Sequence, residues 1–123
     1  MEGGLAGIHE IVGGLVVVAF IVVVLLAAIV AAGRDERWLR TASLIATALL
    51  VVQYVVGVLL ITGGIRNSNT HYAIGLLVLI PVALQHSATR RLSPRTRAVA
   101  VLIWAMAAVF LSVIAYLTGT WGA

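Results

Sequence analysis

Four long apolar runs occupy almost all of this chain of 123 residues. They cover about 6–32, 39–61, 71–87 and 99–118, and each is close to or above the ~20 residues that cross a hydrocarbon core of ~30 Å as a helix. Apolar residues make up 63% of the sequence and charged residues 10%, whereas soluble domains are about half apolar and a quarter charged. The sequence therefore predicts an integral membrane protein in which no soluble domain remains.

Short polar segments separate the runs, which favours antiparallel neighbours and an all-α, up-down-up-down four-helix bundle. We expect a single transmembrane domain over 1–123, with helices at about 6–32, 39–63, 71–89 and 95–119. The first run lacks the basic segment that precedes the core of a cleaved signal peptide, so we expect it to stay in the protein. Pro81 should kink the third helix, and Asn69 or Thr70 should cap its start.

The arginines predict how this bundle is oriented. All eight basic residues are arginine; three follow the first run, four follow the third, and Arg66 alone lies between the second and the third. Because short cytoplasmic loops are rich in basic residues, we expect a multi-pass protein of a prokaryotic-type inner (plasma) membrane with both termini outside. Topology accounts for these arginines, so no nucleic-acid partner is expected.

Two histidines begin matching segments at the start of the first and third helices. Residues 9–16 read HEIVGGLV and residues 71–78 read HYAIGLLV, so His9 and His71 are each followed by glycine four positions later. Gly13 and Gly75 therefore leave a bare patch of backbone one turn from each imidazole. Helices one and three run parallel in the expected bundle, as diagonal partners, which puts both histidines near the outer leaflet.

Ionisable groups inside a bilayer are usually functional, and a pair of imidazoles at one depth strengthens that interpretation. We expect His9 and His71 to be the axial ligands of one heme b, with Gly13 and Gly75 making room for the flat macrocycle. Zinc or copper fits less well, because two histidines fall short of the usual ligand number and Glu10 points away from His9. Cysteine is absent, which excludes thiol redox chemistry and covalent heme attachment through CxxCH.

Two further residues are candidates for cofactor binding. Arg66 is the cation closest to His71 on the outer side and is suited to pairing with heme propionates, the alternative being an ordinary loop arginine. Gln53 lies in the middle of the second run, where it would hold a histidine or approach the heme edge. Its alternative role is a hydrogen bond between helices.

Other side chains have mainly structural interpretations. His86 lies about 15 positions beyond His71, roughly 22 Å along a helix, and no partner histidine remains for it. We expect it at the interface, with a site shared between subunits as the alternative. Met106 is a conceivable soft axial ligand but is more typical of packing. Tyr116 and Trp121 should anchor the outer end of the fourth helix.

The middle of the chain resembles a known family. A first helix that begins with His9, a second containing QYVVGVLLITG at residues 53–63, and a third that begins with His71 are similar to one half of the heme A synthase family. The resemblance covers about 8–90 and implies that the two histidines are axial heme ligands. Only one half is represented, and Glu10 follows His9, whereas the family's catalytic half has a glutamate before a ligand histidine. The resemblance therefore implies a heme-binding bundle, like the small membrane b-type cytochromes, and not heme A synthesis itself.

The resulting hypothesis is a membrane b-type cytochrome that transfers electrons as a subunit of a larger quinone-linked, respiratory or photosynthetic complex. An electron carrier fits this chain better than a stand-alone enzyme. Its expected partners are other membrane subunits, quinol and lipid, with a homo-oligomer as a further option. One alternative is a cofactor-free structural accessory subunit whose glycines serve close helix packing. Another is a small multidrug-type transporter, which the arginine bias and the shallow position of Glu10 both oppose.

Overall fold

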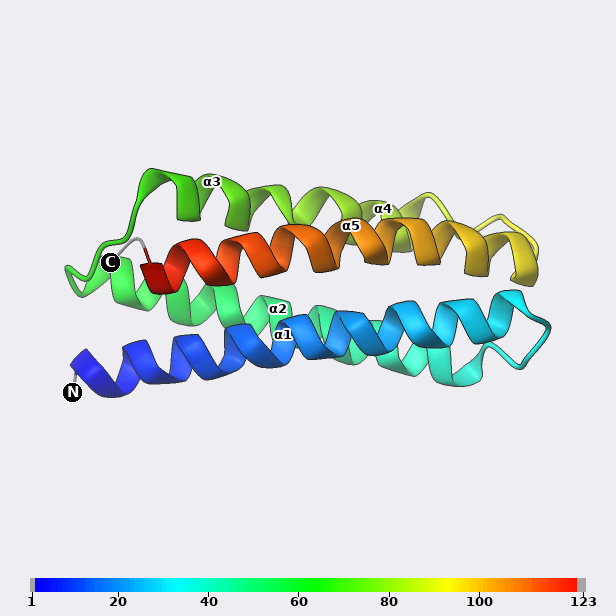
Figure 1. Ribbon diagram of the computed structural model, residues 1–123, viewed down its shortest axis with the longest axis horizontal. Coiled ribbons are helices and arrows are strands. Elements are labelled where there is room, and N and C mark those ends of the chain that lie inside the picture. Colours follow the sequence, from blue (N-terminus) through cyan, green and yellow to red (C-terminus); the bar gives the residue numbers. More distant parts are fainter. Residues whose placement is uncertain (1, 122–123) are drawn as a thin grey trace.

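The computed structural model describes residues 2–121, with side chains over residues 4–119, and this part of the chain consists of helices joined by loops, without strands. The expected all-α class is therefore confirmed. Five helices follow one another along the chain (Figure 1): α1 (Glu2–Ala31), α2 (Arg37–Thr62), α3 (Asn69–Leu77), α4 (Leu79–Ser87) and α5 (Pro94–Trp121). Gly33 and Gly64 follow α1 and α2 with positive φ angles of 105° and 89°, which a residue without a β-carbon adopts at no steric cost.

The helix expected over 71–89 is divided in two at Val78. Pro81 has no backbone N–H, so the carbonyl of Leu77 loses the donor that would continue the helix, and the chain bends there. The start of α3 also differs from the expectation. Its cap is Ser68, whose Oγ accepts a hydrogen bond of 3.2 Å from the backbone N–H of His71, rather than Asn69 or Thr70.

Three helices are long and apolar enough to cross a membrane, namely α1, α2 and α5. The sequence predicts four such spans. The difference arises from the break near Pro81, because α3 and α4 contain nine residues each and neither alone has the length of a bilayer core. Three long apolar helices are compatible with a membrane protein.

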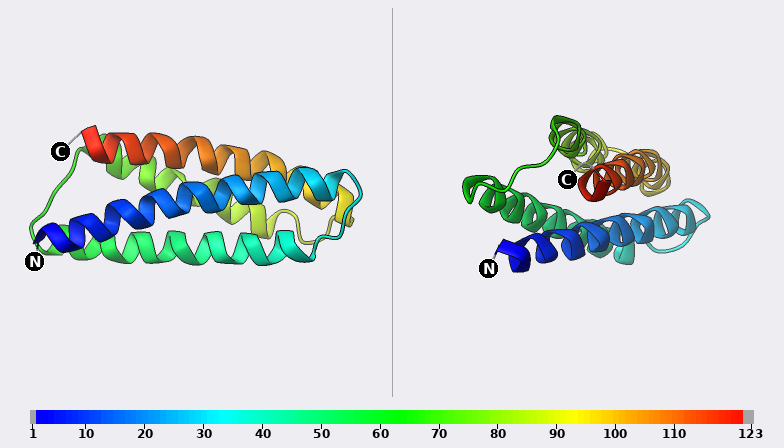
Figure 2. Two further views of the ribbon diagram at one scale, coloured as in Figure 1. Left: turned by 60° about the horizontal axis from the view of Figure 1, so that its bottom comes forward. Right: turned by 60° about the vertical axis from the view of Figure 1, so that its left-hand side comes forward.

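The helices lie side by side as two hairpins, α1 with α2 and α3–α4 with α5 (Figures 1 and 2). Contacts between them run in the order α2, α1, α5, α3–α4. Both ends of the chain lie at the same end of the molecule as residues 63–68. We call this the histidine end, and the opposite end, formed by residues 32–36 and 88–93, the arginine end.

The core is narrow and the outer surface is apolar. Phe20 and Val23 of α1 are fully buried, beside alanines of α5 that include Ala105 and Ala108. Such small residues let helices approach closely. The outward side chains include Ile11 and Phe110, which are 67% and 66% exposed. Extensive exposed apolar surface is unusual in a soluble monomer and is compatible with lipid contact.

Candidate functional site

His9 of α1 and His71 of α3 face each other at the histidine end. Their ring centres are 6.1 Å apart and the ring planes are inclined at 76°. The two residues come from different hairpins, so the approach depends on how the hairpins pack. The structure therefore brings together the two histidines that the sequence pattern singles out.

The two imidazoles line a cavity of about 590 Å³, a size typical of small-molecule and cofactor sites. All six residues expected to bind the cofactor border this one cavity: His9, Gly13, Gln53, Arg66, His71 and Gly75. Most of the remaining wall is apolar. Asn67, which the sequence places beside Arg66, adds a polar group, and so do Tyr54, Tyr72 and Ser112, which the sequence pattern did not single out.

The imidazole of His71 is oriented by the backbone of α5. Its Nδ1 lies 2.8 Å from the carbonyl oxygen of Ala115, so that Nδ1–H donates to this oxygen. In that tautomer Nε2 carries the lone pair and is available to a metal ion. A hydrogen bond from the second ring nitrogen to a carbonyl is the usual way in which proteins orient a histidine ligand.

His9 is held differently, because its Nε2 lies 3.3 Å from the side-chain nitrogen of Gln53 on α2. The amide can donate to an unprotonated Nε2; turned by 180°, its oxygen would instead accept from Nε2–H and leave the lone pair of Nδ1 available to a metal ion. Three buried polar atoms at the cavity have no hydrogen-bond partner among the described residues, namely His9 Nδ1, Gln53 Oε1 and Ser112 Oγ. Buried polar atoms are normally paired, so these three favour a polar occupant of the cavity.

Glycines on the neighbouring helices let the two rings fit. A β-carbon at Gly57 would lie 3.2 Å from Cε1 of His9, and one at Gly119 would lie 2.8 Å from Cε1 of His71. The sequence pattern attributes the free space to Gly13 and Gly75 instead. A β-carbon at Gly13 would meet the Gln53 amide at 2.9 Å, whereas one at Gly75 would meet nothing within 4 Å. Gly75 thus borders open cavity, and Gly13 makes room for Gln53.

Two tyrosines occupy equivalent places beside these glycines. The Tyr54 hydroxyl donates to the carbonyl oxygen of Gly75. The Tyr116 ring packs where Gly13 and Gly14 leave space, with Cδ2 at 3.6 Å from the β-carbon position of Gly13. Tyr116 therefore lines the cavity, because the missing side chains admit its ring. The side chain of Trp121 lies outside the described residues.

An internal repeat explains this correspondence. His9 and Gln53 are 44 positions apart, as are His71 and Ala115. Residues 49–57 read LLVVQYVVG and residues 111–119 read LSVIAYLTG, sharing leucine, valine, tyrosine and glycine at the same four places. Extending the histidine alignment to the second helix of each hairpin would have identified Tyr54, Tyr116, Gly57 and Gly119 from the sequence.

The loop between the hairpins closes the rim of the cavity. Arg66 is exposed, borders the cavity and makes no hydrogen bond or ion pair with the residues that the structure describes. Asn67 fixes the loop, since its side-chain nitrogen donates to the carbonyl of Gly119 at 3.0 Å and its backbone N–H donates to the Tyr72 hydroxyl oxygen at 2.6 Å. A free guanidinium on an ordered loop is suited to binding a carboxylate.

The other candidates lie apart from the histidine pair. His86 is close to the arginine end, with its Nε2 at 2.8 Å from the Thr47 hydroxyl, a partner that the sequence pattern did not indicate. Met106 is 55% exposed on the outer surface, and Glu10 is exposed at the edge of the cavity. Within residues 4–119, whose side chains the structure describes, no three His, Cys, Asp or Glu side chains converge on a common point. This part of the chain therefore provides two imidazoles and no larger protein ligand set.

No protein-family model, curated protein or solved structure matches the chain. The resemblance to one half of the heme A synthase family accordingly stays a hypothesis.

Proposed function

We propose that this chain is a membrane-spanning four-helix bundle that binds one heme b between His9 and His71 and transfers electrons. In this proposal α3 and α4 together form the fourth span, completing the up-down-up-down arrangement. The arginine end faces the cytoplasm and the histidine end faces outward, according to the bias of basic residues in the loops.

The observation that carries the proposal is the separation of the two rings, 6.1 Å between centres. Two imidazoles on opposite sides of one iron have ring centres about 6.2 Å apart, since a metal–nitrogen bond is about 2.0 Å and each nitrogen lies about 1.1 Å from its ring centre. The free Nε2 of His71, the unpaired polar atoms of the cavity and the open space at Gly75 also fit an inserted macrocycle.

Different residues of this chain would hold the iron and the propionates in such a site. His9 and His71 would saturate the iron, and Arg66 would pair with propionates at the rim. The heme would supply one-electron transfer between ferric and ferrous iron, and ligation by two histidines suits that role. Because the site lies near one face of the proposed membrane, a partner subunit or quinol must provide the remaining part of an electron path. Another subunit of a quinone-linked complex, or a second copy of the chain, would fill that role.

An absorption spectrum tests the proposal directly. The protein purified in detergent should show, after reduction with dithionite, the sharp α-band of six-coordinate low-spin heme. His9→Ala and His71→Ala should each abolish or shift that band, whereas His86→Ala should leave it unchanged because His86 borders neither ring. A colourless protein that stays colourless after incubation with hemin would contradict the proposal.

A cofactor-free accessory subunit is the second candidate, and the same ring geometry supplies its argument. A separation of 6.1 Å at 76° also falls within the ~4.5–7 Å range of edge-to-face aromatic pairs. In that case Gly57 and Gly119 would simply allow close packing of helices. Comigration of a colourless chain with a larger membrane complex would favour this candidate.

A further inference from the structure

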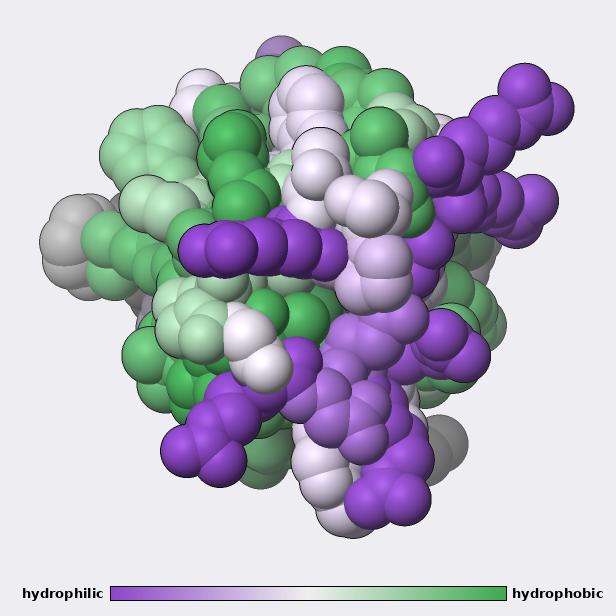
Figure 3. All heavy atoms as spheres, turned by 90° about the vertical axis from the view of Figure 1, so that its right-hand side faces the viewer, coloured by the Kyte–Doolittle hydropathy of each residue, from purple (hydrophilic) through white to green (hydrophobic). Residues whose placement is uncertain are grey.

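A second cavity lies at the arginine end, where α4 and α5 face the start of α2. Its volume is about 350 Å³, and its lining shares no residue with the cavity between the histidines. Three arginines border it, Arg40, Arg90 and Arg97, against one acidic residue, Glu36. The wall is therefore net positive. Figure 3 shows hydrophilic side chains gathered over part of this end of the molecule, with hydrophobic ones around them.

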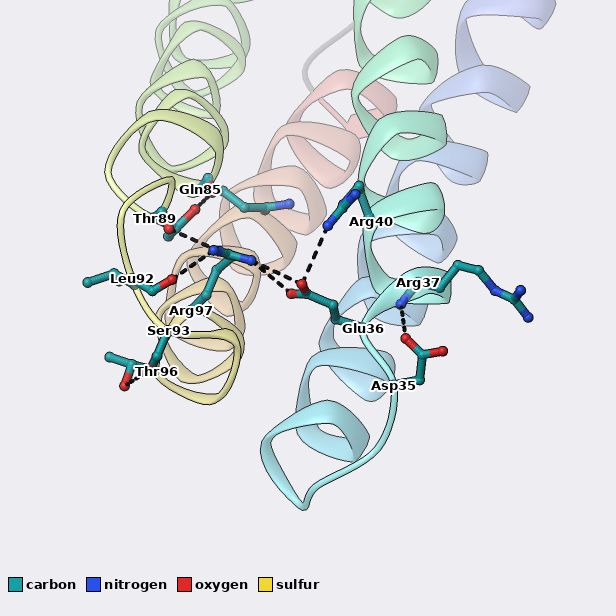
Figure 4. A network of polar contacts seen from close by, with 10 residues as sticks. All are labelled: Asp35, Glu36, Arg37, Arg40, Gln85, Thr89, Leu92, Ser93, Thr96 and Arg97. Carbon is teal, nitrogen blue, oxygen red and sulfur yellow. Dashed lines mark hydrogen bonds and ion pairs between the residues drawn. The ribbon is translucent and has the colours of Figure 1, made fainter.

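One arginine of this cavity is fully engaged by the protein. Arg97 donates to both Glu36 carboxylate oxygens, at 3.1 and 3.0 Å, and also to the backbone carbonyls of Thr89 and Leu92 (Figure 4). Glu36 is thereby neutralised, and Arg40 reaches it only at 3.4 Å with a side chain that is 71% exposed. Arg90 makes no hydrogen bond or ion pair with the described residues. The charge of Arg40 and Arg90 remains available to a ligand.

A buried amide points to a polar ligand between these arginines. Gln85 is 2% exposed and extends from α4 toward α2, deeper in the molecule than the Arg97–Glu36 pair (Figure 4). Its Nε2 donates to the Ser43 hydroxyl at 3.0 Å, but its Oε1 is buried without a partner. Turning the amide by 180° would let the Ser43 hydroxyl donate to Oε1 and would present the NH₂ group to an anion. Both Oε1 and Nε2 of Gln85 then have hydrogen-bond partners.

We propose that this cavity binds the phosphate group of an anionic phospholipid, with Arg40 and Arg90 contacting the phosphate and Gln85 donating from below. A phosphate accepts charge-assisted hydrogen bonds from arginine and needs the donors that these three side chains offer. The lipid is the favoured source, because basic pockets between helices near the cytoplasmic face bind anionic headgroups. This inference rests on the proposed membrane insertion and is independent of heme binding.

The test measures thermal stabilisation of the detergent-purified chain by three probes: dioctanoyl phosphatidylglycerol, dioctanoyl phosphatidylcholine and inorganic phosphate at constant ionic strength. Phosphatidylglycerol should stabilise the protein at lower concentrations than the other two. Arg90→Gln should weaken its apparent affinity by about tenfold, the effect of losing one hydrogen bond between charged groups. Arg91→Gln is the matched control. This substitution removes the same charge one residue away, and Arg91 does not border the cavity.

A second variant keeps the inference falsifiable if Arg90→Gln alters folding. Gln85→Glu preserves the shape of the side chain and places a carboxylate beside the phosphate position, so it should also weaken binding while helical circular dichroism stays unchanged. Stabilisation by inorganic phosphate without lipid preference would support the phosphate site but overturn the lipid as its source. Equal stabilisation of wild type, Arg90→Gln and Arg91→Gln by phosphatidylglycerol would overturn the site itself.

Discussion

Gly57 and Gly119 lie where a β-carbon would press on the imidazoles of His9 and His71. The two positions differ in severity, with β-carbon separations of 3.2 and 2.8 Å from the nearest ring carbon. At Gly119, the tighter position, the His71 ring has less freedom to move away, because it is also held by its hydrogen bond to the carbonyl of Ala115. The position of each histidine ring therefore requires a glycine on a neighbouring helix.

Gly119→Ala should displace the His71 ring and remove most of the heme from the purified protein. Gly57→Ala should have the same effect to a smaller degree, since a shift of a few tenths of an ångström relieves its contact. The heme-to-protein ratio, from the α-band and protein absorbance, measures both. Gly7→Ala on α1 is the control, because nothing lies within 4 Å of its β-carbon position. Equal heme content in all three variants would contradict this account.

Gly75→Ala distinguishes the cytochrome from the cofactor-free subunit. Its β-carbon would enter open cavity, and alanine is favoured over glycine within a helix by about 1 kcal/mol. In a cofactor-free protein this substitution should therefore raise the melting temperature. In a cytochrome the methyl group occupies space that the macrocycle needs, so heme content should fall while the heme-free protein is stabilised. Thermal unfolding and absorbance of the same preparation measure the two effects.

At the scale of helices, α2 is joined to the second hairpin mainly through polar side chains. Tyr54 bonds Gly75 of α3, Ser43 accepts from Gln85 of α4, and Thr47 pairs with His86. The apolar side of α2 packs against α1 instead. Hydrogen bonds donated or accepted by side chains of α2 therefore stabilise the contact between α2 and α3–α4, on the side of the bundle where both cavities lie.

Tyr54→Phe should loosen α2 from α3. The loss of one hydrogen bond costs about 1 kcal/mol, which corresponds to a fall of roughly 4 °C in melting temperature for a domain of this size. Tyr116→Phe provides the matched control, since this tyrosine occupies the equivalent place in the repeat and its hydroxyl makes no hydrogen bond with the described residues. A larger loss of stability in Tyr116→Phe than in Tyr54→Phe would contradict this role of the Tyr54 hydroxyl.

The whole molecule is polarised along its length. Seven of the eight arginines lie in or beside the two loops at one end, and the histidine cavity lies at the other with Arg66 at its rim. If the chain spans a membrane, this polarity determines the face from which each cavity is reached. A partner that exchanges electrons with the proposed heme would approach from outside, and anionic lipid would come from the cytoplasmic leaflet.

Single cysteines test this orientation on a background that has none. In intact cells Asn69→Cys, at the histidine end, should react with a membrane-impermeant maleimide. Ala88→Cys, at the arginine end, should react only after permeabilisation. Both positions are exposed, so a difference in labelling reports sidedness and not burial. The reverse pattern would place the termini in the cytoplasm and overturn the proposed topology.

The helical fold follows from the sequence, because long apolar runs in a bilayer must satisfy their backbone hydrogen bonds internally, and a helix does this within one segment. The break near Pro81 is equally local, since proline removes one donor wherever it stands. The histidine pair could also be singled out, because a charged or polar ring in an apolar run is conspicuous. The orphan oxygen of Gln85 and the second cavity could not be predicted, since each depends on which helix lies opposite.

Composition and spacing by themselves determined that this chain is helical, that it has the apolar length to enter a membrane, and that His9 and His71 belong to matching segments. Only the tertiary structure decided that the two rings meet at 6.1 Å, that Gly57 and Gly119 make room for them, and that Gln53 lies at hydrogen-bonding distance from His9. The physical reason is that helix formation depends on neighbours along the chain. The rotation and approach of packed helices depend on how small and large side chains interlock across the bundle.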